Sequence, residues 1–330
     1  MGSQVNRGPC RSFDVMFFFS LSIVADVKAG ETARSYLSAV GGREKACVEQ
    51  TTHWPFSSLA LHGPGLFRRT RKKKVRAIQH YLDIVGSIMP RDWITTQPCL
   101  WHGDLHEGNI FVDPSNSTTI TSIIDWQSVE IAPLFVQVRQ PSILDCEGPQ
   151  VKGLEQPEPP GNISEVPPNE RTQANANFHL ASLSAQYRFW LHAHNPSAWR
   201  GMQYQEEPVH SLIVLVRKLF VDGEAMYMAK LLELVESQPE LFGSKLPVFT
   251  AEERAEIISD AEAVVHGMDM MAGIKKALGD LFPERGLVVS PEQYEEVKDA
   301  LRQMKEQVIQ QCASTEEEKE QWLQAWPWDN

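Results

Sequence analysis

The sequence has few cysteines, and none of them are spaced to bind zinc or to form a disulfide framework. Five cysteines are spread over 330 residues, with no C-x-x-C pair and an odd total. Zinc sites commonly use closely spaced pairs of cysteines, and disulfide scaffolds use many cysteines in an even number. We therefore expect a reducing compartment and a fold stabilised by its hydrophobic core, since 42% of the residues are hydrophobic.

Long hydrophobic runs are also missing. The mostly apolar run at residues 15–25 is too short to cross a bilayer as a helix, so we expect no membrane span. Arg7 and Arg11 precede it, with no acidic residue before Asp14. Residues 1–30 are an atypical N-terminal segment with three interpretations. One is a targeting segment, against which Asp14 and the lack of an A-x-A-like cleavage site count. The others are a buried strand and a gene-model artefact, of which we prefer the artefact.

Positive charge is scarce as well. The chain has 31 Lys and Arg against 43 Asp and Glu, a net charge of -12. Nucleic acid is bound mainly by clustered basic residues, so we expect no nucleic-acid partner. The basic run at residues 68–74 is expected to form a solvated face at the start of a helix over residues 75–85. The alternative is a nuclear address or an anionic contact.

Residues 100–127 contain the most informative pattern in the chain. His102, Asp104 and Asn109 follow the order H-x-D-x-x-x-x-N, which is the spacing of a phosphotransferase catalytic loop. In such a loop the aspartate accepts the proton of the substrate hydroxyl, and the asparagine side-chain oxygen binds Mg²⁺. Asp104 is therefore the predicted base, and Asn109 is a predicted metal ligand. His102 and His106 are expected to have structural roles in the loop, through hydrogen bonds or packing.

A hairpin is predicted directly after this loop. Residues 110–112 are apolar, residues 113–117 are rich in turn formers, and residues 119–124 are almost entirely β-branched. Because a hairpin returns the chain to its starting point, Asp125 should lie level with Asn109 and share its Mg²⁺.

Residues 102–109, together with Ile124-Asp125-Trp126, resemble the aminoglycoside phosphotransferase and choline kinase superfamily, the small-molecule branch of the protein-kinase-like fold. Residues 128–135 and 320–328 resemble more narrowly the fungal proteins called altered inheritance of mitochondria protein nine. The resemblance extends from about residue 31 to the C-terminus. It implies Mg²⁺ and ATP as cofactors, Asp104 and His102 in the catalytic loop, and Asn109 and Asp125 as cofactor and metal ligands. It also implies a mitochondrial location, with the cytoplasm as the alternative.

Departures from the protein-kinase pattern narrow the expected substrate. Gly103 stands where many protein kinases have an arginine that binds a phosphorylated activation loop. Trp126-Gln127 replaces the Phe-Gly that follows the metal-binding aspartate. We therefore expect a small hydroxylated substrate instead of a protein.

The ATP-binding upper lobe of a kinase fold has no counterpart in the sequence pattern. Such a lobe needs a glycine-rich loop and a strand lysine paired with a helical glutamate. No G-x-G-x-x-G occurs before His102, and Lys28 is a poor substitute for the lysine because no strands precede it. The N-terminal lobe is therefore expected to be missing.

The rest of the chain is predicted to be helical. Residues 31–50 should form one or two short helices broken at Gly41-Gly42. The Pro-rich segment at residues 147–170 is either a flap over the substrate or a surface loop. Helices follow over residues 174–330, one of them capped by Thr250 with Glu253.

These patterns together predict an α+β, mostly helical fold: a protein-kinase-like C-terminal lobe over residues 31–330 with a small β-hairpin at its catalytic site. The expected function is ATP- and Mg²⁺-dependent phosphoryl transfer to a small-molecule hydroxyl, impaired in this chain by the missing lobe. The alternative is a non-catalytic, kinase-like protein with a binding or mitochondrial-maintenance role. The substrate and the oligomeric state are not specified by the sequence.

Overall fold

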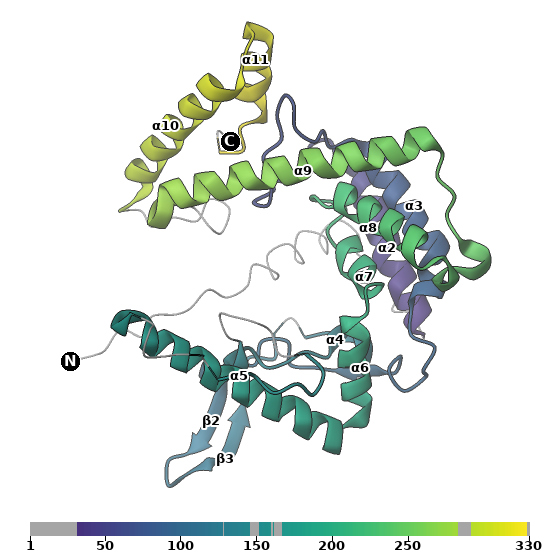
Figure 1. Ribbon diagram of the computed structural model, residues 1–330, viewed down its shortest axis with the longest axis vertical. Helices are drawn as coiled ribbons and strands as arrows, with labels where there is room; N and C mark the ends of the chain where they lie inside the picture. Colours follow the sequence, from purple (N-terminus) through teal and green to yellow (C-terminus); the bar gives the residue numbers. More distant parts are fainter. Residues whose placement is uncertain are drawn as a thin grey trace. The chain divides into compact units, whose positions relative to one another are not determined.

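A computed structural model describes residues 32–127, 129–145, 152–159, 161, 167–282 and 292–328 (Figure 1). The segment at residues 1–30 and much of the Pro-rich segment therefore lie outside the described residues. The described chain is rich in helix, with two small two-stranded sheets. None of its helices is long and apolar enough to cross a membrane. The structure is thus the helix-rich α+β fold that the sequence predicts.

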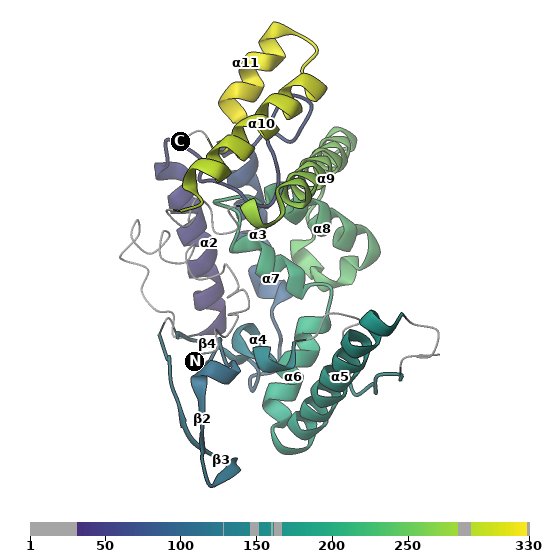
Figure 2. The ribbon, with the colours of Figure 1, turned by 90° about the vertical axis from the view of Figure 1, so that its left-hand side faces the viewer.

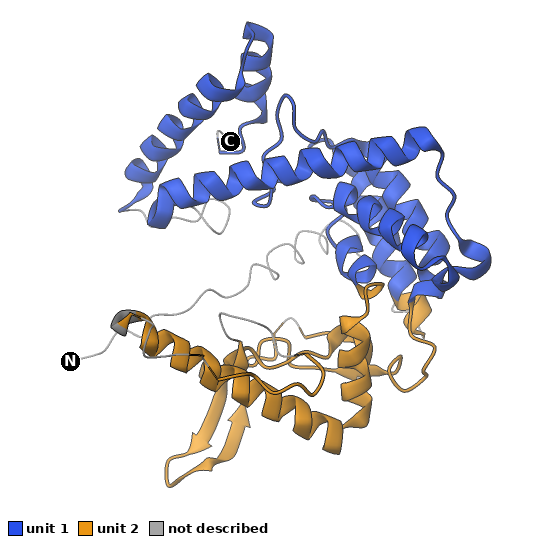
Figure 3. Ribbon diagram, viewed as in Figure 1, with its two compact units in different colours: residues 1–28, 37–88, 211–330 blue, residues 29–36, 89–210 orange. Residues whose placement is uncertain are grey.

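The chain divides into two compact units (Figure 3). Unit 1 contains residues 37–88 and 211–330 among its parts, and unit 2 contains residues 29–36 and 89–210. We describe each unit by itself.

Unit 1 is helical. Its elements are α2 (Ala33–Gln50, of which the first residues belong to unit 2), α3 (Arg71–Ile88), α7 (His210–Val216), α8 (Glu224–Ser237), η3 (Pro239–Leu241), η4 (Gly243–Lys245), α9 (Ala251–Leu278), η5 (Gly279–Leu281), α10 (Tyr294–Cys312) and α11 (Glu316–Ala325). Trp322, Trp326 and Trp328 are buried in a cluster with apolar residues of α9 and α10. As predicted, Thr250 and Glu253 form a capping box at the start of α9, which ends at Leu278.

Helix α2 corrects the predicted break at Gly41-Gly42, because it runs without interruption from Ala33 to Gln50. A Cβ atom added at Gly41 would lie 2.8 Å from the Tyr81 ring of α3. The glycine therefore allows two helices to approach closely, and the packing gained there outweighs its low helix propensity.

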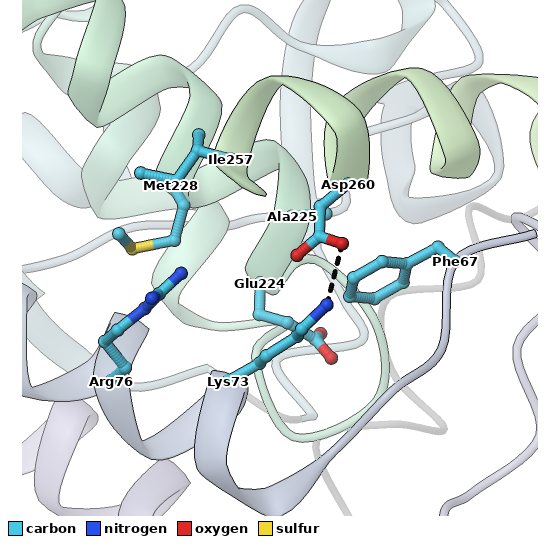
Figure 4. A pocket seen from close by; sticks show the side chains of 8 residues that line it. All are labelled: Phe67, Lys73, Arg76, Glu224, Ala225, Met228, Ile257 and Asp260. Carbon is cyan, nitrogen blue, oxygen red and sulfur yellow. Dashed lines mark hydrogen bonds and ion pairs between the residues drawn. The ribbon is translucent and has the colours of Figure 1, made fainter. Parts of the chain in front are cut away.

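The basic run at residues 68–74 also differs from its prediction as a solvated face. Helix α3 begins inside this run, and Lys74 is fully buried, with its Nζ 2.8 Å from Glu224 Oε2. The neighbouring Lys73 pairs with Asp260 Oδ1 at 2.7 Å (Figure 4). Charged pairs thus link α3 to α8 and to α9, and the run has a packing role that its composition does not indicate.

Unit 2 contains the two sheets and the helices that follow them. Its elements are β1 (Pro98–Leu100), η1 (Glu107–Asn109), β2 (Ile110–Asp113), β3 (Asn116–Ile123), β4 (Ile131–Pro133), α4 (Leu134–Gln137), η2 (Ser142–Leu144), α5 (Pro168–His194) and α6 (Pro196–Glu206). Strand β1 pairs with β4 and β2 pairs with β3, both antiparallel. Figure 2 shows β2 and β3 as a projecting ribbon, and Phe111, Val112 and Ile120 on it are exposed.

Gln137 connects the β1–β4 sheet to α4. Its buried Nε2 donates to the carbonyl oxygens of Cys99 at 2.7 Å and of Glu130 at 2.8 Å. Helix α4 packs on α6, where a Cβ atom at Gly201 would lie 2.9 Å from Val138. Cys99 and Glu130 lie on either side of the segment that contains the hairpin. Because Gln137 binds both of them, the two ends of this segment are held together.

Candidate functional site

The β2–β3 hairpin brings the two predicted metal ligands to neighbouring backbone positions. Ile110 is paired with Ile123, and beyond this pair the N–H of Ile124 donates to the carbonyl oxygen of Asn109 at 3.0 Å. Asp125 follows directly. The predicted hairpin is confirmed, and its strands close the sequence distance between Asn109 and Asp125.

Asn109 is held with its side chain in a defined orientation. The residue is 5% exposed and ends the η1 turn, where its N–H donates to the carbonyl of His106. Its amide Nδ2 donates to the backbone carbonyl of Asp104 at 2.9 Å. Because that bond uses the nitrogen end of the amide, the oxygen end remains as the acceptor, and an amide oxygen is a ligand that Mg²⁺ accepts.

Asp104 lies on the loop with its side chain half-exposed. His106 Nε2 is 3.9 Å from Asp104 Oδ2, and His106 Nδ1 accepts from the N–H of Gly108 at 3.1 Å. The second bond makes Nδ1 the acceptor of the neutral ring, so Nε2 carries the hydrogen and faces the carboxylate. His106 is therefore a hydrogen-bonded loop residue, as the sequence predicts.

His102 connects the predicted catalytic loop to the end of the hairpin. Its Nε2 donates to the carbonyl oxygen of Ile124 at 2.9 Å, and its ring lies edge-on to Trp126, with centroids 4.8 Å apart. Its Nδ1 is buried and has no hydrogen-bond partner among the described residues. These contacts support the structural role expected for His102.

Asp125 has the most unusual backbone of the site. With φ at 63°, it is the one non-glycine residue in the described chain with a positive φ. Aspartate tolerates this region better than most residues, yet the conformation still costs on the order of 1 kcal/mol. Strained residues of this kind concentrate at functional sites, where the surrounding structure fixes them. The strained backbone of Asp125 and its exposed side chain therefore support a functional role for this residue.

Arg139 and Ser142 are neighbours of the site that sequence reasoning missed. Arg139 Nη1 donates to the carbonyl of Gly103 at 3.3 Å, and Ser142 Oγ donates to the carbonyl of Leu105 at 3.2 Å. Both residues follow α4 and fix the carbonyls on either side of Asp104. Their spacing from the motif carries no signal in a single sequence.

The two predicted ligands, Asn109 and Asp125, are both oxygen donors, which suit a metal that keeps part of its water shell. Within the described residues, no group of three or more His, Cys, Asp or Glu side chains could hold a metal ion. A site made of the Asn109 amide and the Asp125 carboxylate suits Mg²⁺, which is bound through one or two carboxylates, waters and substrate phosphates. The residues present therefore fit Mg²⁺ and not a metal held fully by protein, such as structural zinc.

Comparison with known proteins finds one matching family. The sequence model of the phosphotransferase enzyme family matches residues 54–136. The match includes His102, Asp104, Asn109 and Asp125, and it supports the aminoglycoside phosphotransferase superfamily that the motif resembles.

Curated relatives cover nearly the whole chain at low identity. The subtelomeric hrmA-associated cluster proteins of two Aspergillus fumigatus strains are 22% identical to it over 331 residues, 96% of this chain. The chain spans 64% of the length of these relatives. No solved structure matches.

Proposed function

We propose that this chain carries the catalytic loop and the metal site of an ATP- and Mg²⁺-dependent phosphotransferase that acts on a hydroxyl of a small molecule. The observation that supports the proposal is the Asn109–Ile124 backbone bond, which brings the backbones of the two proposed metal ligands of the matched segment close together. The fold assignment proposed with it is a protein-kinase-like C-terminal lobe.

Each residue has a role that follows from its contacts. Asp104 would accept the proton of the attacking hydroxyl, because its half-exposed carboxylate is within reach of a substrate in solution. Asn109 and Asp125 would hold Mg²⁺, which when bound neutralises charge on the transferred phosphate. His102 would keep these residues in register by binding the carbonyl of Ile124.

ATP affinity is expected to be weak in this chain. The sequence has no glycine-rich loop before His102, and a kinase normally holds the β-phosphate and the adenine from the lobe that carries this loop. Isothermal titration with Mg-ATP tests the point. A dissociation constant in the low micromolar range would contradict it and would place a nucleotide site elsewhere in the chain.

A non-catalytic role is the second candidate. It is favoured by the same observation, the lack of a glycine-rich loop before His102. A kinase-like protein that binds a partner without transferring phosphate would keep the hairpin but would not need an ATP-binding site. The narrower resemblance to altered inheritance of mitochondria protein nine adds a mitochondrial location to this proposal, with the cytoplasm as the alternative. Labelling the chain in fungal cells and imaging it with a mitochondrial marker would distinguish the two locations.

The metal site can be tested without ATP. Mn²⁺ replaces Mg²⁺ in such sites, and its free concentration is measurable by electron paramagnetic resonance. We expect Asp125→Asn and Asn109→Ala to weaken Mn²⁺ binding by about tenfold or more, since each removes or weakens one oxygen ligand.

Asp113→Asn is the matched control. Asp113 lies at the far end of the same hairpin, where it accepts from the N–H of Ser115, and asparagine can accept the same bond. Equal Mn²⁺ affinity in the wild type and in all three variants would reject the metal site. An equal loss of Mn²⁺ affinity in Asp113→Asn and Asp125→Asn would mean that Mn²⁺ binds to surface charge without a specific site.

A further inference from the structure

Helix α5 exposes two large aromatic side chains that have no part in the phosphotransferase loop. Phe189 is 54% exposed and Trp190 is 52% exposed, and their rings lie edge-on with centroids 6.3 Å apart. The ring of Trp190 is also stacked on His194, 4.8 Å away and nearly parallel. Adjacent exposed aromatics leave apolar area in water, and on soluble proteins such patches commonly mark binding sites.

The aromatic pair lines a recess of about 400 Å³. Ser182, Gln186 and Phe189 follow one another at helical spacing and form one wall with Trp190. Gln156, from the Pro-rich segment, lines it as well. The volume falls within the range of small-molecule sites and is large enough for one or two sugar rings.

The wall that carries Gln156 is fixed by a buried arginine. Arg188, 6% exposed, donates through Nε to the carbonyl of Gly153 at 2.8 Å and pairs with Glu206. The N–H of Gly153 in turn donates to Glu206 Oε1 at 3.4 Å. The guanidinium of Arg188 also lies over the ring of Trp199, 5.5 Å from its centroid. Because the segment is held by both of its backbone polar groups at Gly153, the recess is a built feature of unit 2.

The chemistry of the lining selects a class of ligand. Gln156, Gln186 and Ser182 all donate and accept hydrogen bonds, as hydroxyl groups do. Among the described residues, no lysine or arginine lines the recess to favour a phosphate, and no carboxylate lines it to favour a cation. Phe189 and Trp190 supply apolar faces for the C–H side of a ring.

We propose that this recess binds an uncharged polyhydroxylated ring, such as a neutral mono- or disaccharide. The wall formed by α5, with its two aromatic rings and Gln186, would contact one side of the ligand, and Gln156 would contact it from the Pro-rich segment. The proposal does not depend on phosphoryl transfer, since none of its residues lies in residues 100–127. It gives the Pro-rich segment a function that its composition leaves open.

Saturation-transfer difference spectroscopy of the chain with glucose, maltose and myo-inositol tests the proposal. We expect saturation transfer to at least one of these neutral ligands, with C–H protons on one ring face receiving most of it. Glucosamine and glucose 6-phosphate should respond more weakly than glucose. A stronger response from either charged sugar, or no response from any neutral ligand at tens of millimolar, would overturn the proposal.

Variants locate the site. Trp190→Ala and Gln186→Leu should each weaken binding by about tenfold, which corresponds to the loss of one good contact. Trp93→Ala is the matched control, because Trp93 is a 69% exposed tryptophan of the same unit outside the recess. The substituted side chains are at the surface, and far-ultraviolet circular dichroism checks that the variants fold. Undiminished binding in folded Trp190→Ala and Gln186→Leu would overturn the assignment to this recess.

Discussion

Ile124 is bound by the loop at residues 102–109 through both of its backbone polar groups. Its N–H donates to the carbonyl of Asn109 at 3.0 Å, and its carbonyl accepts from His102 Nε2 at 2.9 Å. Asp125 is the next residue, so its position depends on the loop that carries Asp104. The proposed base and the proposed metal ligand are therefore connected through the backbone.

The backbone conformation of Asp125 predicts a difference in stability between two variants that lack its carboxylate. Asp125→Gly and Asp125→Ala both remove the carboxylate, but glycine adopts a φ of 63° without steric cost. We expect the glycine variant to be more stable than the alanine variant by about 1 kcal/mol in urea unfolding, with equally weak Mn²⁺ binding in both. If the alanine variant is as stable as the glycine variant, the strain is not present in solution.

Asp104→Asn should separate base chemistry from metal binding. We expect Mn²⁺ affinity within about twofold of the wild type, because Asn109 binds the backbone carbonyl of Asp104 and not its side chain. Any phosphoryl transfer that can be measured should fall by about a hundredfold or more, as for the loss of a general base. A large loss of Mn²⁺ affinity would make Asp104 a metal ligand instead.

The Lys74–Glu224 pair predicts a large cost for removing one charge. Both side chains are buried, and Lys74 Nζ also donates to the carbonyl of Leu219 at 2.8 Å. Lys74→Met should lower the free energy of unfolding by about 3 kcal/mol or more, because it leaves Glu224 buried without its partner. Lys72→Met is the control, since Lys72 is exposed.

A double variant tests the physical reason. Lys74→Met combined with Glu224→Leu should recover part of the lost stability, because no unpaired charge then remains. Chemical unfolding of the wild type, Lys74→Met, Glu224→Leu and the double variant at one pH gives the comparison. Losses that simply add in the double variant would mean that Lys74 acts through packing alone.

Glu44 predicts a loss of stability as the pH rises. Burial raises its pKa from 4.5 to about 7, against the opposing effects of a hydrogen bond from the N–H of Phe220 and of nearby cations, of which Arg43 is the largest. Between these values the folded chain binds the proton more tightly than the unfolded chain does. Glu44 therefore contributes on the order of 3 kcal/mol to the free energy of unfolding below about pH 4.5. This contribution is lost as the pH rises through 7.

Glu44→Gln should flatten the stability profile between pH 5 and pH 7.5, because glutamine does not titrate. Asp222 acts in the opposite direction. His62 and Ser57 bind its carboxylate and lower its pKa against the desolvation that raises it, so its contribution is lost when the pH falls. Urea unfolding of wild type and Glu44→Gln at several pH values checks the prediction, and parallel profiles would refute it.

Local signals predicted much of the site. The turn residues and the β-branched run specified the hairpin, and Thr250 with Glu253 specified the start of α9. Gly41 and Lys74 were misinterpreted because their environments come from residues distant in sequence: the Tyr81 ring for one and Glu224 for the other. The positive φ of Asp125 could not be predicted either, since the residue before it, Ile124, is held by His102 and Asn109, and no local pattern specifies these contacts. Propensities describe neighbours along the chain, whereas these features depend on tertiary contacts.

The β2–β3 ribbon has a consequence for handling the protein. Within the described residues neither strand has a second partner, and Phe111, Val112 and Ile120 leave apolar side chains in solvent. Unpaired edges with exposed apolar residues are templates for strand addition between chains, and a threonine-rich strand without charge offers little repulsion against it. Self-association should therefore increase with protein concentration and begin at this ribbon. A lysine at Thr119 or Thr121 would oppose it while leaving Asn109 and Asp125 unchanged.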